Sequence, residues 1–367
     1  MFNAINRTFG FILLAVTTGL TVGCQGGFDL GESPAGDAAG EISSRQGPAQ
    51  NDHPFEQTQA RLDRGRYLVE GSARCFMCHS DIDWTKPGRQ PKEGRKGAGH
   101  IWIDEVLPWL PQHGDLERRS GWLGLRRQLV VSHNITPDRE TGAGDWSDDV
   151  LVQAIRQGIG HDGRVLYPGM PLQRFRQLSD EDLASIIVYL RSIPAVRNPL
   201  PVTVLPAEIR ESLQPSEPIT EPVLSPDLFD PVEWGAYLVG LSDCTGCHNA
   251  FDQDSQPIPE LAFSGGALLK ESWGQVTAPN ITPDPSGISY YDEDLFIQVM
   301  RTGWVGARQL KPIMPWSFYG NMTDEDLKAI FVYLMALDPI VHWVDNTEPA
   351  TYCKLCGGTH GLGNRND

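Results

Sequence analysis

The stretch Cys75-Phe76-Met77-Cys78-His79 decides how this chain folds, and it recurs as Cys244-Thr245-Gly246-Cys247-His248. On a turn of helix, residues three and four apart share a face, so the two thiols lie side by side with the imidazole on the same surface. This order of groups is the attachment pattern of c-type haem, with two thioether bonds to the porphyrin and the histidine on the iron. A structural zinc site or a redox cysteine pair with a chance histidine is the alternative, and the recurrence in matching context argues against it. We therefore predict two covalently bound c-type haems, held by Cys75, Cys78, His79, Cys244, Cys247 and His248.

The second half of the chain repeats the first. Four segments match in order: Gly65-Arg-Tyr-Leu-Val with Gly235-Ala-Tyr-Leu-Val, Asn134-Ile-Thr-Pro-Asp with Asn280-Ile-Thr-Pro-Asp, Met170-Pro171 with Met314-Pro315, and Ser179-Asp-Glu-Asp-Leu with Thr323-Asp-Glu-Asp-Leu. The spacing from motif histidine to methionine is about two dozen residues shorter in the second copy, because the first carries an insertion over 81–131. We call residues 60–198 the first repeat and residues 231–342 the second repeat, and we predict one domain in each.

The N-terminus predicts export. Residues 1–23 place one positive charge before an apolar run that is too short to span a bilayer, as in a secretory signal peptide. The run ends at Gly23-Cys24, which resembles the lipidation site of bacterial lipoproteins, and Cys24 is the one cysteine outside a CxxC pair. We expect a lipid anchor at Cys24 in the periplasm or cell envelope, or alternatively a soluble export signal cleaved nearby. Residues 24–59, rich in Gly, Ala, Ser and Asp, are predicted to form a flexible tether.

Two further segments lie outside the repeats. Residues 199–230 are rich in Pro and Glu and are predicted to form a semi-extended linker. The C-terminal tail, residues 343–367, contains Cys353-Lys-Leu-Cys356-Gly357, where glycine replaces the histidine of a third haem motif. We predict a disulfide there, with a metal site that includes His360 or a redox dithiol as alternatives. The formal net charge of −17 argues against a nucleic-acid partner.

Each iron needs a sixth ligand, and the methionine thioether is the one that favours ferrous iron and raises the reduction potential. Met77 lies inside its own motif and cannot reach across the porphyrin, which leaves Met170 in the first repeat. In the second repeat, Met314 occupies the loop equivalent to that of Met170, and it is our predicted ligand. The competing methionines there are Met300 and Met335, which fall in predicted helices, and Met322, which is the reserve.

Histidines of the first repeat are rival ligands. His100, His113, His133 and His161 have no counterparts in the second repeat. A single loop histidine more often caps a turn or faces solvent than binds metal. His161, nine residues before Met170, is the strongest rival.

Other local patterns predict turns and helix ends. The Asn-Ile-Thr-Pro-Asp segments fit rigid turns, either packed on a haem and bonding a propionate or serving as plain turns. Ser147 is expected to cap a helix that stops at Gly158, and Ser179 to start the clearest helix of the chain. The run from Gly158 to Gly163 matches a dinucleotide-binding pattern, but the helix that precedes it and the loop that follows exclude that function.

Taken together, these residues make the chain resemble the c-type cytochrome family, and within it the multi-haem subunits that accompany periplasmic alcohol, aldehyde and gluconate dehydrogenases. The shared features are the haem motifs, the Asn-Ile-Thr-Pro-Asp segments and the string Gly163-Arg-Val-Leu-Tyr-Pro-Gly-Met-Pro171. The resemblance implies an all-α fold with two tandem cytochrome c domains of the class I type, joined by long loops and the Pro-rich linker. In that fold the first and last helices cross, which places Gly65 against the Tyr189 helix and Gly235 against the Tyr333 helix. The chain departs from those subunits in having two haem motifs instead of three.

The expected function is single-electron transfer between a periplasmic dehydrogenase, or another redox donor, and a terminal oxidase or soluble cytochrome. Two irons with complete ligand sets leave no open position for catalysis, so we expect an electron carrier rather than an enzyme. The alternative is a dihaem enzyme of the peroxidase or thiosulfate dehydrogenase type, in which one haem is catalytic.

Overall fold

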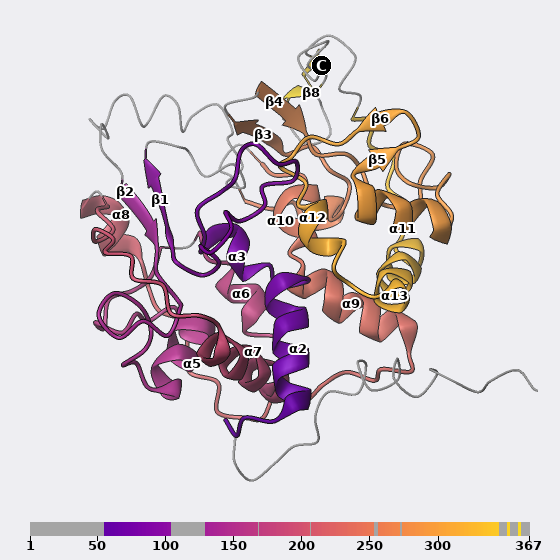
Figure 1. Ribbon diagram of the computed structural model, residues 1–367. Helices are drawn as coiled ribbons and strands as arrows, with labels where there is room; N and C mark the ends of the chain where they lie inside the picture. The colour runs from indigo at the N-terminus through magenta and orange to yellow at the C-terminus, as the bar shows by residue number, and fades with distance from the viewer. Residues whose placement is uncertain are drawn as a thin grey trace, which may run out of the picture. The chain divides into compact units, whose positions relative to one another are not determined.

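The computed structural model (Figure 1) describes residues 55–103, 129–167, 169–205, 207–252, 256–271, 274–344, 351–352 and 359–360. The predicted signal peptide, Cys24, most of the tether, His113, Cys353 and Cys356 lie outside these residues. The helices are α2 (Gln59–Glu70), α3 (Cys75–Cys78), α5 (Asp148–Gln157), α6 (Leu172–Phe175), α7 (Asp180–Ser192), α8 (Ala207–Ser212), α9 (Pro231–Leu241), α10 (Cys244–His248), η1 (Pro259–Leu261), α11 (Glu293–Thr302), α12 (Trp316–Tyr319) and α13 (Asp324–Met335). Within the described part of the chain, none of these helices is long and apolar enough to cross a membrane.

In each repeat the first and last helices pack against each other, α2 on α7 and α9 on α13 (Figure 1). The contact is close because a glycine lies at each crossing. A Cβ atom on Gly65 would lie 2.0 Å from the carbonyl oxygen of Ser185. A Cβ atom on Gly235 would lie 2.0 Å from that of Ala329. The predicted crossings are therefore confirmed.

The predicted helix ends are also confirmed. The Ser147 hydroxyl accepts a hydrogen bond from the Val150 amide (3.3 Å), and Gly158 ends α5 in the left-handed conformation. The Ser179 hydroxyl accepts from the Asp182 amide (3.1 Å) at the start of α7. These contacts satisfy backbone groups that a helix terminus leaves without partners. After Gly158 the chain folds back on itself, since Ile159 and Val165 form a β-bridge, so the dinucleotide pattern is not followed by a helix.

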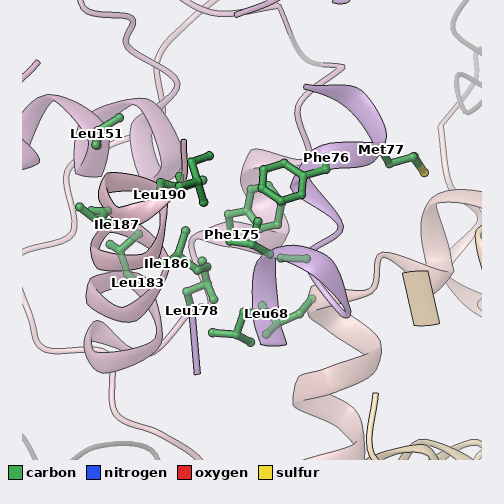
Figure 2. Close-up of a cluster of buried hydrophobic side chains, with 14 of the residues drawn as sticks. Leu68, Phe76, Met77, Leu151, Phe175, Leu178, Leu183, Ile186, Ile187 and Leu190 are labelled. Atoms are coloured by element: carbon green, nitrogen blue, oxygen red, sulfur yellow. The ribbon is translucent and has the colours of Figure 1, made fainter. Parts of the chain in front are cut away.

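Each repeat has its own hydrophobic core. Figure 2 shows the core of the first repeat, where α7 contributes Leu183, Ile186, Ile187 and Leu190. The ring of Phe76 points toward Phe175 in this core, whereas Met77 extends to the other side of α3. The core of the second repeat has equivalent members: Leu238, Phe296, Leu327, Ile330, Phe331 and Leu334.

Short strands occur in the loops and were not predicted. Within the described residues they form four two-stranded antiparallel ribbons: β1 (His100–Ile103) with β2 (Leu129–Ser132), β3 (Leu268–Glu271) with β4 (Gly274–Thr277), β5 (Trp304–Val305) with β6 (Arg308–Gln309), and β7 (Thr351–Tyr352) with β8 (Thr359–His360). The first ribbon lies in the insertion and pairs residues 25 or more positions apart, which local patterns do not reveal. The side chains of Trp102 and Val131 in this ribbon are buried. The fold is helix-rich, as expected of a cytochrome c fold, with strands confined to the loops.

The two repeats contact each other through equivalent residues. The Tyr67 hydroxyl donates to the carboxylate of Asp326 in the second repeat. Conversely, the Tyr237 hydroxyl donates to Asp182 in the first repeat (2.7 Å). By the matched segments, Tyr67 corresponds to Tyr237 and Asp182 to Asp326. The interface therefore exchanges the same hydrogen bond in both directions, as a two-fold symmetric interface does.

Further partners reinforce both carboxylates. Asp182 also receives two hydrogen bonds from the buried Arg64 guanidinium, both 2.7 Å long. Asp326 receives one from the indole nitrogen of Trp234 (2.7 Å). Buried carboxylates are stable only when hydrogen-bonded in this way, so the interface is specified by polar contacts as well as apolar packing.

The linker lies along the first repeat and is bonded to it at three places. Val204 pairs with Leu129 of β2 through two backbone hydrogen bonds of 2.8 and 3.1 Å. The Ser216 amide donates to the Gln157 carbonyl (2.9 Å), and the Asp180 amide donates to the Val223 carbonyl (2.9 Å). Residues 199–230 are therefore hydrogen-bonded to the first repeat at several points along their length.

Candidate haem sites

The first motif is folded as its chemistry requires. Cys75 and Cys78 form the ends of α3, and neither takes part in a disulfide. Burial raises the pKa of the Cys75 thiol to about 12 and also raises that of Cys78. Thiols that ligate zinc or exchange disulfides have lowered pKa values, because the thiolate is the reactive form. Neutral, buried thiols suit uncharged thioether bonds better.

The imidazole of His79 is oriented by a backbone carbonyl. Its Nδ1 atom lies 2.7 Å from the carbonyl oxygen of His133, and burial lowers its pKa. A nitrogen that faces a carbonyl carries the proton, which leaves the lone pair of Nε2 for a metal. The side chain is thus held as a neutral ligand of fixed direction.

The second motif has the same construction. Cys244 and Cys247 lie in α10, are not in a disulfide, and have thiol pKa values raised to about 12 by burial. Nδ1 of His248 lies 2.8 Å from the carbonyl oxygen of Pro279, and burial lowers the pKa of this imidazole too. Both sites therefore present one neutral imidazole and two neutral thiols.

The Asn-Ile-Thr-Pro-Asp segments explain this equivalence. His133 and Pro279, whose carbonyls orient the two histidines, each immediately precede one of these segments. The Asn134 side chain accepts from the Thr136 amide and hydroxyl (3.0 and 2.7 Å), and Asn280 does the same with Thr282 (2.9 and 2.8 Å). The segments are turns, and they fix the carbonyl in front of them. Sequence reasoning missed this function, although the repetition of the segments pointed to it.

One cavity of about 1110 Å³ contains both motifs. A cavity that holds one drug-sized ligand measures roughly 300–1,000 Å³, so this one is larger than a single small ligand requires. All the predicted haem-binding residues line it: Cys75, Cys78, His79, Met170, Cys244, Cys247, His248 and Met314. Two thiols and one imidazole of each motif line this cavity, so the donor groups present fit the covalent attachment of haem.

The two predicted methionine ligands lie at equivalent points of the fold. Met170 precedes α6 and its carbonyl accepts from the Leu172 amide (2.8 Å). Met314 precedes α12 and its carbonyl accepts from the Trp316 amide (2.9 Å). Among the other methionines, Met77 and Met300 also line the cavity, while Met322 is buried in the second core.

Two rival histidines share the cavity with Met170. His161 stacks on the Trp146 ring, with centroids 4.3 Å apart and planes 13° apart. His133 contacts the Arg164 guanidinium, and burial together with that charge lowers its pKa to about 4. His100 instead faces Asp81 (3.4 Å) and packs edge-on against Trp102.

Several relatives of the chain are named as cytochromes or cytochrome subunits. It is 35% identical over 298 residues to the fructose dehydrogenase cytochrome subunit of Gluconobacter japonicus, covering 77% of this chain and 54% of that protein. It is 29% identical to the gluconate 2-dehydrogenase cytochrome c subunit of Pantoea cypripedii (76% and 60% covered) and 26% identical to a diheme cytochrome c-type protein of Cereibacter sphaeroides (57% and 72% covered). The chain spans between 21% and 60% of the length of the dehydrogenase subunits that it matches. No family model matches it. The chain is thus similar to dihaem cytochromes c and to the cytochrome c subunits of dehydrogenases.

Proposed function

We propose that this protein is a periplasmic dihaem cytochrome c that passes single electrons from a dehydrogenase to a respiratory acceptor. The observation that carries the proposal is the pair of Cys-x-x-Cys-His motifs in one cavity, each with its histidine held by a carbonyl at 2.7 or 2.8 Å. The names of the related dehydrogenase subunits support the choice of donor. The acceptor would be a terminal oxidase or a soluble cytochrome.

Each repeat would be a cytochrome c domain with its own ligand set. His79 and Met170 would bind one iron, and His248 and Met314 the other, with the four motif cysteines as thioether anchors. When bound, a haem supplies an iron that gains or loses one electron. With haem bound, the largely apolar cavity walls would limit the access of water, and the histidines, which backbone carbonyls hold in place, would need no movement between the two oxidation states. Both would limit the reorganisation that electron transfer requires.

The haem count is the direct test. Intact mass under denaturing conditions should show the mature chain with two covalent haems, and His79→Ala should retain the haem of the second repeat. A wild-type protein with one or no haem would contradict the proposal. The same mass measurement identifies the N-terminal residue of the mature chain. This residue should be a lipidated Cys24 if residues 1–23 are a lipoprotein signal peptide.

A dihaem enzyme is the second candidate, because His161 lines the same cavity as Met170. In that case one iron would lose or exchange its sixth ligand and react with small molecules. A carrier with two methionine-ligated haems should bind carbon monoxide poorly when reduced and turn over neither peroxide nor thiosulfate. Rapid binding by the wild-type protein, with turnover of either substrate, would favour the enzyme.

A further inference from the structure

A largely shielded, partly buried ion pair lies between the two haem motifs. Arg74 immediately precedes Cys75, and Asp243 immediately precedes Cys244. Both residues adopt positive φ angles, 42° and 51°, so they occupy the same position in the two motifs. Nη2 of Arg74 lies 3.8 Å from Oδ2 of Asp243, and their side chains are only 13% and 18% exposed.

Arg74 and Asp243 are equivalent residues of the two repeats, and they meet near the axis that relates one repeat to the other. In a two-fold interface a residue near the axis contacts its equivalent, and two identical charges there would repel each other. Here the equivalents carry opposite charges and attract. The pair therefore joins the two motifs directly, each through the residue next to its first cysteine.

Further contacts connect this ion pair to the segments that follow Met170 and Met314, the two predicted methionine ligands. Arg74 donates to the Ser242 carbonyl and to the Tyr319 hydroxyl, and its guanidinium lies 5.6 Å from the centre of the Tyr319 ring. Tyr319 belongs to α12, which follows Met314. Arg174, in α6 after Met170, donates to Asp243 (3.1 Å) and to Thr245 inside the second motif.

The cluster formed by Arg74, Arg174 and Asp243 carries a net positive charge. Arg74 and Arg174 contribute two positive charges, and Asp243 contributes one negative charge. Burial acts to lower the pKa of Arg74, but Tyr319 and Asp243 outweigh it, so the guanidinium stays charged. Arg74 also lines the cavity together with the cysteines of both motifs, so one arginine faces both attachment sites.

Building on the proposed function, we propose that Arg74 is a positioning residue shared by both haems: it holds the two attachment motifs together and raises the reduction potential of both. A buried positive charge disfavours the extra positive charge of an oxidised iron, and the effect is large where water is excluded. An arginine that served only its own motif would act on the first haem alone.

The test is a redox titration of the full-length, haem-loaded protein in which both midpoint potentials are resolved. Arg74→Gln should lower both potentials, and Asp243→Asn should raise both, because it leaves two unneutralised arginines. Arg74→Lys keeps the charge and should leave both close to the wild type. The matched control is Arg66→Gln, in which an exposed arginine paired with Asp63 is neutralised in α2; it should move neither potential.

The outcomes are separable. A shift of only one potential in Arg74→Gln, or of neither, would overturn the shared role. If Arg74→Gln does not fold, Asp243→Asn still decides the question by the direction of its shifts. Denaturing mass gives the haem count of each protein: a wild-type chain without two haems would refute the proposed function, whereas a wild type with two haems whose potentials do not respond to Arg74→Gln would refute only the role of Arg74.

Discussion

The two candidate haem sites have the same set of predicted ligands and differ in what surrounds them. Each has an arginine six residues before the methionine, Arg164 or Arg308, on the cavity wall. The first site also contains His133 and His161. At the equivalent positions the second repeat has Pro279 and Val305. The residues predicted to hold the haem are thus repeated, whereas the residues around them diverge. Because the carbonyls of His133 and Pro279 have the same function, the backbone role is kept while the side chain is free to change.

The largest effect is expected when either predicted methionine ligand is removed. Met170→Ala and Met314→Ala should each open one iron, so the reduced variant binds carbon monoxide at about half of its haem, and the potential of that haem falls because a thioether stabilises ferrous iron. Carbon monoxide difference spectra measure the fraction. The two variants should behave alike if the sites are equivalent. Met170→Ala without any new binding would instead indicate that another residue ligates the first iron.

The helix crossings should respond next most strongly. Gly65→Ala and Gly235→Ala force a methyl group against a backbone oxygen 2.0 Å away, and overpacking of this kind costs about 1–3 kcal/mol or more in the free energy of unfolding. Denaturant titration of each variant gives the value. Arg66→Ala, on the exposed side of α2, is the control and should cost little. Equal losses would show that the two crossings are equivalent, and a clear difference would show that they are not.

The exchanged tyrosines should separate the two halves of the interface. Tyr67→Phe leaves Asp326 with Trp234, whereas Tyr237→Phe leaves Asp182 with the doubly bonded Arg64. We expect a loss of about 2 kcal/mol for Tyr67→Phe and about 1 kcal/mol for Tyr237→Phe. Both tyrosines bond a carboxylate, but Asp182 keeps two bonds from the charged Arg64, whereas Asp326 keeps one bond from a neutral indole. Thermal or denaturant unfolding measures both, with the exposed Tyr290→Phe as control. The reverse order would mean that Arg64 does not compensate.

The smallest effect is expected for His161→Ala. If Met170 is the ligand, removing the ring that stacks on Trp146 should leave the absorption spectra of both haems unchanged in either oxidation state. A new high-spin band, with carbon monoxide binding, would identify His161 as the first site's sixth ligand.

The features that could be predicted from the sequence are those that depend on residues close together in the chain. Ser147, Ser179 and Gly158 end their helices where expected, because capping involves atoms three or four residues apart. Gly65 and Gly235 lie at the crossings that the family resemblance implied. The hydrogen bond from Tyr67 to Asp326, 259 positions away, could not be predicted, since it depends on how the two repeats dock. The β1–β2 ribbon was missed for a similar reason: its partners are separated by the insertion.

The attachment of the linker to the first repeat has a consequence for how the chain assembles. Beyond Val223, the last bonded position, only eight residues lead to Pro231 at the start of α9, at most about 29 Å when extended. So short a connection keeps the second repeat at an effective concentration on the order of millimolar at its partner surface. A domain swap, in which second repeats are exchanged between two chains through the same symmetric interface, would need protein concentrations of that order. We therefore expect each second repeat to remain with the first repeat of its own chain.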